Sequence, residues 1–201
     1  MRKETIAGTV IFLLLLSASA APLVIASPGT VELMGLEWNH DPLKVYIKAP
    51  PELIPHIITA LNNWSDALKT ASKNQSAFNF TIVTSSKGAD IIINVQKGAA
   101  AGVLGMTILQ DKNKDGYFDQ VKITVKAGLG FDPADFRNVV RHEIGHALGL
   151  GHETTGETDL MDPTYDVSGI GYDIYPSTLD IEALLSIYGD DGFGGENLPP
   201  E

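Results

Sequence analysis

The chain has 201 residues, a formal net charge of -11 at pH 7 and no cysteine. Its length suggests one domain with short appendages, and its 44% hydrophobic and 19% charged residues are ordinary for a globular protein. The acidity, together with the lack of a basic stripe, argues against a nucleic-acid partner. Without cysteine the chain can form no disulfide and can offer no thiolate to a metal.

The first 26 residues have the pattern of a targeting segment. Arg2 and Lys3 precede the apolar run 6–16 and the small residues 18–20, which is typical of a secretory signal peptide cleaved after about residue 20. The apolar stretch is also close to the length of an uncleaved membrane anchor, although its serines disfavour that interpretation. Either interpretation exports the domain, so we expect an extracellular protein, with membrane contact only through such an anchor.

Residues 27–41 are expected to be a linker, and 42–189 an α+β domain followed by an acidic, flexible tail at 190–201. Alternating or continuous apolar runs predict strands at 44–48, 78–84, 89–96, 106–110 and 121–125. A first helix, from about residue 52 or 55 to 69, is predicted by apolar residues at helical spacing: Ile54, Ile57, Ile58, Leu61, Trp64 and Leu68. A last helix begins near Ser177, with Asp180 as its capping partner, and ends at Gly189.

The stretch 111–119 fits the first part of a calcium-binding loop, D-x-N-x-D-G-x-x-D. The candidate ligands are Asp111, Asn113, Asp115, the carbonyl of Tyr117 and Asp119. An EF-hand would have a glutamate where Lys122 stands, and it would be flanked by helices rather than strands. We therefore predict a hairpin loop that binds structural calcium; the alternative is an ordinary polar turn.

The sequence HEIGHALGLGH, residues 142–152, is the most informative stretch. Because an α-helix turns about 100° per residue, His142 and His146 lie near each other, one turn apart, and can hold one metal ion. Gly149 can take the positive φ that ends a helix, and the bend returns His152 as a third ligand. Glu143 lies beside this pair, close to the place of a metal-bound water. Three imidazoles and one open position describe a catalytic zinc site rather than a closed structural one.

A helix over 131–148 is predicted to carry this motif. Asp132 is its expected N-cap, Pro133 suits the first turn, and Asp135 stands three residues after the cap. The same helix has an apolar face, so packing would hold the two histidines and Glu143 in place.

The extended motif H-E-x-x-H-x-x-G-x-x-H resembles that of the metzincin zinc endopeptidases. The following LMDPTY, residues 160–165, resembles the Met-turn of the matrixin branch, the matrix-metalloprotease-like enzymes. The resemblance implies an α+β fold with a metzincin-like twisted mixed sheet of about five strands and three helices. A zinc cleft would lie between the sheet half and a small C-terminal half. Met161 would lie beneath the zinc, and Pro163 and Tyr165 would line the substrate pocket.

The resemblance also implies an activity, that of a monomeric, secreted zinc endopeptidase acting on polypeptides. It would hold one catalytic zinc, with Glu143 as the general base that activates a zinc-bound water. An edge strand at about 103–109 would bind the substrate backbone as an added strand. Glu153, directly after the third histidine, is closer to the astacins, whereas Pro163, two residues after the methionine, favours the matrixins.

Two other functions fit the same residues. One is a secreted calcium- and zinc-binding adhesion or binding module without proteolytic activity. Glu143 argues against it, because a purely structural zinc site has no use for that carboxylate. The other is a zinc hydrolase acting on something other than protein, which the motif by itself does not exclude.

Overall fold

The computed structural model describes residues 30–73, 77–99, 101–128, 130–153, 159–164 and 171–189, together with the backbone of 8–13. The strands are β1 (Gly8–Leu13), β2 (Val31–Leu33), β3 (Leu43–Lys48), β4 (Phe80–Val83), β5 (Ile91–Lys97), β6 (Gly105–Asp111), β7 (Gln120–Ala127) and β8 (Leu150–Glu153). The helices are α1 (Ile54–Ala71), α2 (Pro133–Ala147) and α3 (Thr178–Tyr188), with a short 3-10 turn at Pro51–Leu53. None of the helices described is both long enough and apolar enough to cross a membrane.

The main sheet is mixed and has the strand order β1-β6-β7-β5-β3-β4. Strand β3 pairs in parallel with β4 and β5, and β5 pairs in parallel with β7. Strand β6 runs antiparallel to β7, as expected of two strands joined by a hairpin loop. The five strands β3 to β7 and the three helices confirm the predicted α+β fold class.

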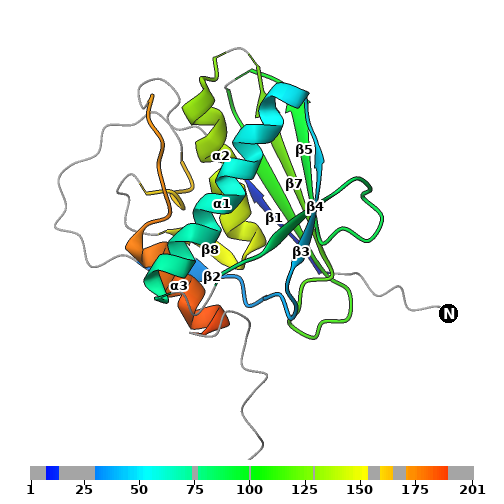
Figure 1. The fold of residues 1–201 in the computed structure, drawn as a ribbon, viewed down its shortest axis with the longest axis vertical. Coiled ribbons are helices and arrows are strands. Elements are labelled where there is room, and N and C mark those ends of the chain that lie inside the picture. Colours follow the sequence, from blue (N-terminus) through cyan, green and yellow to red (C-terminus); the bar gives the residue numbers. More distant parts are fainter. Residues whose placement is uncertain are drawn as a thin grey trace, which may run out of the picture.

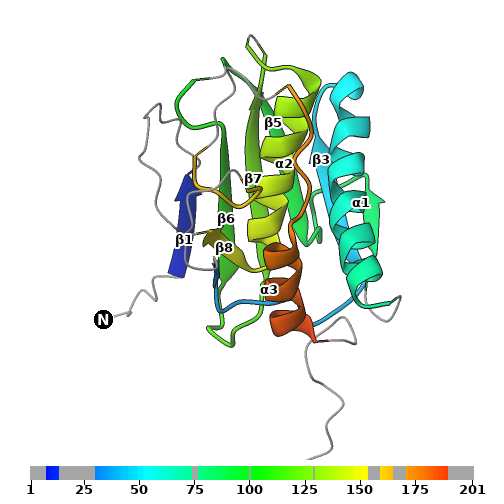
Figure 2. The ribbon, with the colours of Figure 1, turned by 90° about the vertical axis from the view of Figure 1, so that its left-hand side faces the viewer.

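A sixth strand, β1, extends the sheet beyond β6 (Figure 2). It comes from the segment predicted to be a signal peptide or anchor, and its register runs from Gly8 opposite Asp111 to Leu13 opposite Met106. The pairing is antiparallel. The outer edge of β6 therefore accepts an added antiparallel strand.

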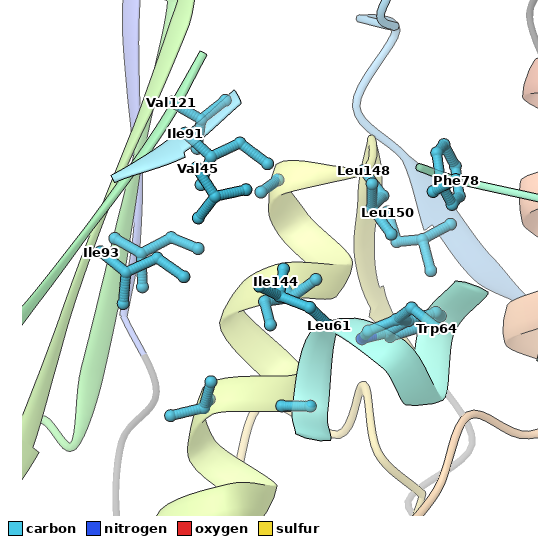
Figure 3. Packing of buried hydrophobic residues seen from close by; sticks show 14 of the residues in the cluster. Val45, Leu61, Trp64, Phe78, Ile91, Ile93, Val121, Ile144, Leu148 and Leu150 are labelled. Atoms are coloured by element: carbon cyan, nitrogen blue, oxygen red, sulfur yellow. The ribbon is translucent and has the colours of Figure 1, made fainter. Parts of the chain in front are cut away.

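Helices α1 and α2 pack on the same face of the sheet (Figures 1 and 2). The predicted apolar stripe of α1 is the reason, since Ile57, Leu61, Trp64 and Leu68 are all buried. Figure 3 shows sheet residues Val45, Ile91, Ile93 and Val121 on the side that faces Ile144 of α2. The core thus lies between the sheet and α2, and it fixes the helix that carries the histidines.

The stretch 30–41, expected to be a linker, packs onto the domain. Its strand β2 pairs antiparallel with β8, and the fully buried Trp38 donates a hydrogen bond from Nε1 to the carbonyl of Ala147 (2.8 Å). Tyr188 of α3 joins the same region, donating from its hydroxyl to the carbonyl of Leu148 (3.0 Å). The chain before β3 and the last helix therefore both hold the C-terminal end of α2.

Candidate metal centre and active site

The three histidines of the motif come from two elements joined by one turn. His142 and His146 lie on α2, and His152 lies on β8. The turn depends on Gly149, whose φ is +98° and whose added Cβ would lie 2.6 Å from the carbonyl oxygen of Leu36. Both the conformation and the close approach therefore exclude a larger residue at this position.

The start of α2 is fixed by the predicted capping residues. Asp132 accepts hydrogen bonds from the backbone of Ala134 (2.7 Å) and Asp135 (2.8 Å), and the Asp135 side chain accepts one from the Asp132 backbone. This reciprocal capping box, with Pro133 in the first turn, confirms the predicted N-terminus of the helix.

The ligand atoms of the three histidines converge. One nitrogen from each of His142, His146 and His152 lies within 4.8 Å of the other two. His142 donates from Nδ1 to the carbonyl of Leu160 (2.7 Å), and His146 donates from Nδ1 to the carbonyl of Leu150 (2.8 Å). A carbonyl only accepts, so in these two rings Nδ1 carries the proton and Nε2 keeps its lone pair. The donor set fits a zinc ion held by imidazole Nε2 atoms.

Burial keeps these rings neutral, as metal ligands must be. Desolvation lowers the pKa of His142 to about 3 and lowers the pKa of His146 well below its usual value. His152 is half-buried, and burial lowers its pKa as well. At neutral pH all three imidazoles are therefore ready to bind a cation.

Glu143 is a fully buried carboxyl beside this group. The Thr107 hydroxyl on β6 donates to its Oε2 (2.5 Å), and Oε1 has no hydrogen-bond partner in the described part of the chain. Desolvation raises the pKa of Glu143 to about 8, and the hydrogen bond from Thr107 opposes that rise. A cation at the three histidines would lower the pKa further, which brings the carboxylate into the range of a general base near neutral pH.

The sequence reasoning missed two residues on β6 that position Glu143. One is Thr107, and the other is Gly105, where an added Cβ would lie 2.2 Å from Oε1 of Glu143. The glycine is therefore needed for the close approach of β6 to the carboxylate. The alternation of apolar residues predicted strand β6 itself. It could not predict which β6 residues contact Glu143, because that depends on how the strand lies over α2.

The segment 159–164, which the sequence predicted to be a Met-turn, lies against α2. Met161 is fully buried, and a Cβ added at Gly145 would lie 2.5 Å from its sulfur. The carbonyl of Leu160 receives the hydrogen bond from His142, and the carbonyl of Met161 receives one from the backbone of Glu153 (2.9 Å). The turn therefore supports both α2 and β8, the two elements that carry the histidines. Pro163 is half-buried next to this turn, and Tyr165 lies outside the described residues.

The family model for the matrixins, peptidase family M10, matches residues 37–189. The chain belongs to the matrixin family. It is 31% identical to metalloendoproteinase 2-MMP of Arabidopsis thaliana over 156 residues, which cover 70% of this chain and 38% of that relative. It is 39% identical to stromelysin-2 of Rattus norvegicus over 75 residues, 37% of this chain and 15% of that relative. The alignments thus span well under half the length of either relative.

The predicted calcium loop of this matrixin joins β6 to β7. It curls around Asp111, whose carboxylate accepts hydrogen bonds from the backbone of Lys114 (2.6 Å), Asp115 (3.2 Å) and Gly116 (3.3 Å). Asp119 accepts one from the backbone of Lys112 (2.5 Å). Among the described residues, only the three histidines form a group of three or more His, Cys, Asp or Glu ligand atoms within 4.8 Å. The loop carboxylates are thus grouped but do not meet at a single point.

Asp180 is a buried carboxyl at the start of α3. As the sequence predicted for a cap, it accepts a hydrogen bond from the backbone of Ser177 (2.8 Å), and its side chain is fully buried. Its other oxygen has no hydrogen-bond partner within the described part of the chain. Burial, followed by the nearby charge of Asp159 in the Met-turn, raises the pKa of Asp180 to about 7. The folded protein therefore favours the protonated form of this carboxyl.

Proposed function

We propose that this matrixin is a secreted zinc endopeptidase in which Glu143 is the general base. One observation carries the proposal: a buried carboxyl lies beside three neutral imidazoles whose ligand atoms converge within 4.8 Å. A structural zinc site needs no such carboxylate, whereas hydrolysis needs a base that can take a proton from water. The family membership supports peptide bonds as the substrate.

The proposed reaction uses the groups already in place. Zinc bound to the three histidines supplies a Lewis acid, which makes a water more acidic and polarises a carbonyl. Glu143 accepts the proton of the attacking water and later passes it to the leaving amine. Thr107 orients the Glu143 carboxylate by donating to one oxygen, which leaves the other free to meet the water. The hydrogen bonds that His142 and His146 donate to the carbonyls of Leu160 and Leu150 keep these two imidazoles from turning.

The substrate would bind as an extended chain along β6. Strand β1 supports this, because it pairs with that edge in the antiparallel direction and reaches Met106, one residue from the glycine that contacts Glu143. An edge strand holds any extended backbone, and neighbouring pockets then select side chains. Removal of a signal peptide at about residue 20 would also remove β1 and open the edge to substrate. Pro163 and Tyr165 remain the proposed wall of a substrate pocket.

The first test measures metal and proteolysis in the same preparation. We expect about one zinc per chain and cleavage of an unstructured protein such as casein, with the cleavage lost when a zinc chelator is added. Zinc without cleavage would favour a binding module instead. Folded protein without zinc would contradict the assignment of the three histidines.

Replacement of the proposed base gives a sharper test. Glu143→Ala removes the carboxylate but none of the ligands, so we expect full zinc content and a fall in kcat of about a thousandfold or more. His146→Ala is the matched control on the same helix, because it should lose zinc and activity together. Turnover near the wild-type rate in Glu143→Ala would show that another group is the base.

We also propose that the 111–119 loop binds structural calcium through Asp111, Asn113, Asp115, Asp119 and the Tyr117 carbonyl. The support is the D-x-N-x-D-G-x-x-D pattern, which places three carboxylates in one hairpin loop, and Gly116 at φ +88°, which makes the sharp turn that such loops need. Secretion is proposed from the targeting pattern of the first 26 residues. N-terminal sequencing of the exported protein tests it, and we expect a new terminus near residue 21 or 22.

A further inference from the structure

A cluster of ionic and polar contacts fixes the segment Gly171–Tyr175 against α2, one turn before the first histidine. Arg137 donates from Nε and Nη2 to the two carboxylate oxygens of Asp173, at 2.6 Å each. Arg141, whose side chain is 1% exposed, lies 2.7 Å from the same carboxylate. Together the two guanidinium groups lower the pKa of Asp173 to about 2, so it remains charged throughout the neutral range.

Asn138 adds two bonds to the backbone of the same segment. Its amide nitrogen donates to the carbonyl of Tyr172 (2.9 Å), and its amide oxygen accepts from the backbone of Ile174 (2.8 Å). The ring of Tyr175 lies over the guanidinium of Arg141, 4.7 Å from its central carbon. Residues 172–175 are therefore held at every position, which is unusual for a loop that joins two elements.

The clamped segment closes a small cavity next to the zinc ligands. The cavity is lined by Ile174, by three residues of α2 and by three of the Met-turn: Asn138, Val139, His142, Asp159, Leu160 and Asp162. The space open to the centre of a water-sized sphere is about 10 Å³, which is the room of roughly one water molecule. Because His142 forms one wall, a substrate side chain that enters here belongs to a residue next to the cut bond.

We propose that Asp173 is a specificity-determining residue of this protein. By holding Ile174 and its neighbours against α2, it limits this cavity to a small substrate side chain, of the size of glycine, alanine or serine, beside the cut bond. The inference rests on the proposed endopeptidase function. Asp173 touches neither the metal ligands' coordinating atoms nor Glu143, and it acts as a positioning residue through Ile174.

The size limit follows from the way the wall is built. A larger side chain would have to displace Ile174, and this would break its backbone bond to Asn138 and pull Asp173 away from two guanidinium groups. Arg141 is buried, so loss of Asp173 would leave its charge inside the protein without a carboxylate partner. The clamped wall therefore resists a displacement that an unclamped loop would permit.

The test compares the exported wild-type protein, with its N-terminus processed, with Asp173→Ala and Ile174→Ala made in the same form. The substrates are fluorogenic peptides that differ only at the residue before or the residue after the cut bond, with alanine, leucine or phenylalanine there. The cut position is checked by mass spectrometry. At one of the two positions, we expect the wild type to prefer alanine to phenylalanine by at least tenfold in kcat/KM. Both variants should move this ratio toward phenylalanine by at least tenfold, mainly through KM for the large substrate.

Asp66→Ala is the matched control, because it makes the same chemical change at an exposed position of α1, and it should leave the ratio unchanged. A merely structural role for Asp173 would lower kcat/KM for all peptides equally. Should Asp173→Ala fail to fold, Ile174→Ala decides, since it widens the cavity without touching an ion pair.

The outcomes separate the two proposals. A wild type that cleaves alanine and phenylalanine peptides equally at both positions overturns the size limit, and so does an unchanged ratio in the variants, while proteolysis itself stands. Failure of the wild type to cleave any peptide overturns the proposed function, and this inference falls with it.

Discussion

At the scale of single residues, the proposed chemistry depends on how Glu143 is held. Its carboxyl is fully buried, and burial raises its pKa, while one hydroxyl on a neighbouring strand lowers it. The convergence of the three histidines could be predicted from spacing, because they and Glu143 lie within eleven residues of one helix and turn. Thr107 and Gly105 could not, because their role arises only when β6 is laid across α2.

Loss of the Thr107 hydroxyl should shift the pH profile of the enzyme. Thr107→Val keeps the volume but removes the donor to Glu143, so the pKa of Glu143 rises. Since the base acts only when deprotonated, the acid limb of kcat/KM should move to higher pH. Thr107→Ser, which keeps a hydroxyl, should leave the limb close to its wild-type position. An unmoved limb in Thr107→Val would mean that Thr107 does not tune the base.

A methyl group at Gly105 should displace the base without disturbing the metal. The added Cβ would lie 2.2 Å from Oε1 and 2.7 Å from Cδ of Glu143, so the carboxylate must move. A shift of about 1 Å in a reacting group can cost about a hundredfold in rate, and we expect a loss of that order in kcat for Gly105→Ala. Zinc content should be unchanged. Wild-type activity in this variant would show that the carboxylate has room to spare.

At the scale of elements, the sequence predicted the order of the helices and strands, but only some of the contacts between them. Both capping boxes were predictable, because a cap and its partner are three residues apart. The closeness of Asp159 to Asp180 and the bonds that tie segment 171–175 to α2 were not predictable. Asp159 and Asp180 are 21 positions apart in the chain, and Asp173 is more than thirty from its two arginines, so no local pattern pairs them.

The Asp159–Asp180 pair should make stability depend on pH. The pKa of Asp180 is raised from 3.8 to about 7 in the folded state, so folding favours the protonated form. Its contribution is present below about pH 4 and is lost as the pH rises to about 7. Asp180→Asn keeps an acceptor for Ser177 and offers a permanent donor to Asp159. We expect this variant to raise Tm at pH 8, by about 2–4 °C for each kcal/mol gained, and to change it little at pH 4.

Thermal unfolding of the wild type and of Asp180→Asn between pH 4 and pH 8 checks the direction of this pH dependence. Ser177→Ala, which removes the helix cap and leaves both carboxyls in place, is the control and should lower Tm at every pH. A wild-type Tm that rises relative to that of Asp180→Asn between pH 4 and pH 8 would contradict the raised pKa of Asp180.

At the scale of the whole molecule, the order of elements and the fold class were predictable from periodicity. The structure of the N-terminal segments outside β3–α3 was not predictable in this way. Trp38 is fully buried and β2 pairs with β8, although the stretch that contains them has the composition of a linker. A strand of three residues carries too little alternation to be recognised, and its partner β8 lies more than a hundred residues away. The position of β1 beside β6 likewise depends on which sheet edge is open.

The calcium proposal is testable as a property of the whole fold. The loop closes the β6–β7 hairpin and is hydrogen-bonded to Glu37, so an ion there would tie the lead-in to the sheet. We expect calcium at a hundred times its Kd to stabilise the protein by about 2.7 kcal/mol and to raise Tm accordingly. Because the chain has a net charge of -11, magnesium at the same concentration controls for general screening. Asp119→Asn should abolish the specific effect, and equal responses to both ions would count against the site.

The two indole groups offer a built-in optical probe of this helix. The chain has two tryptophans, both fully buried, and each donates its ring N–H to a carbonyl of α2: Trp64 to Arg141 (2.9 Å) and Trp38 to Ala147 (2.8 Å). One thus lies directly before His142 and the other directly after His146. All of the tryptophan fluorescence of the protein therefore reports on the segment between them, and metal loading can be followed by emission without any added label.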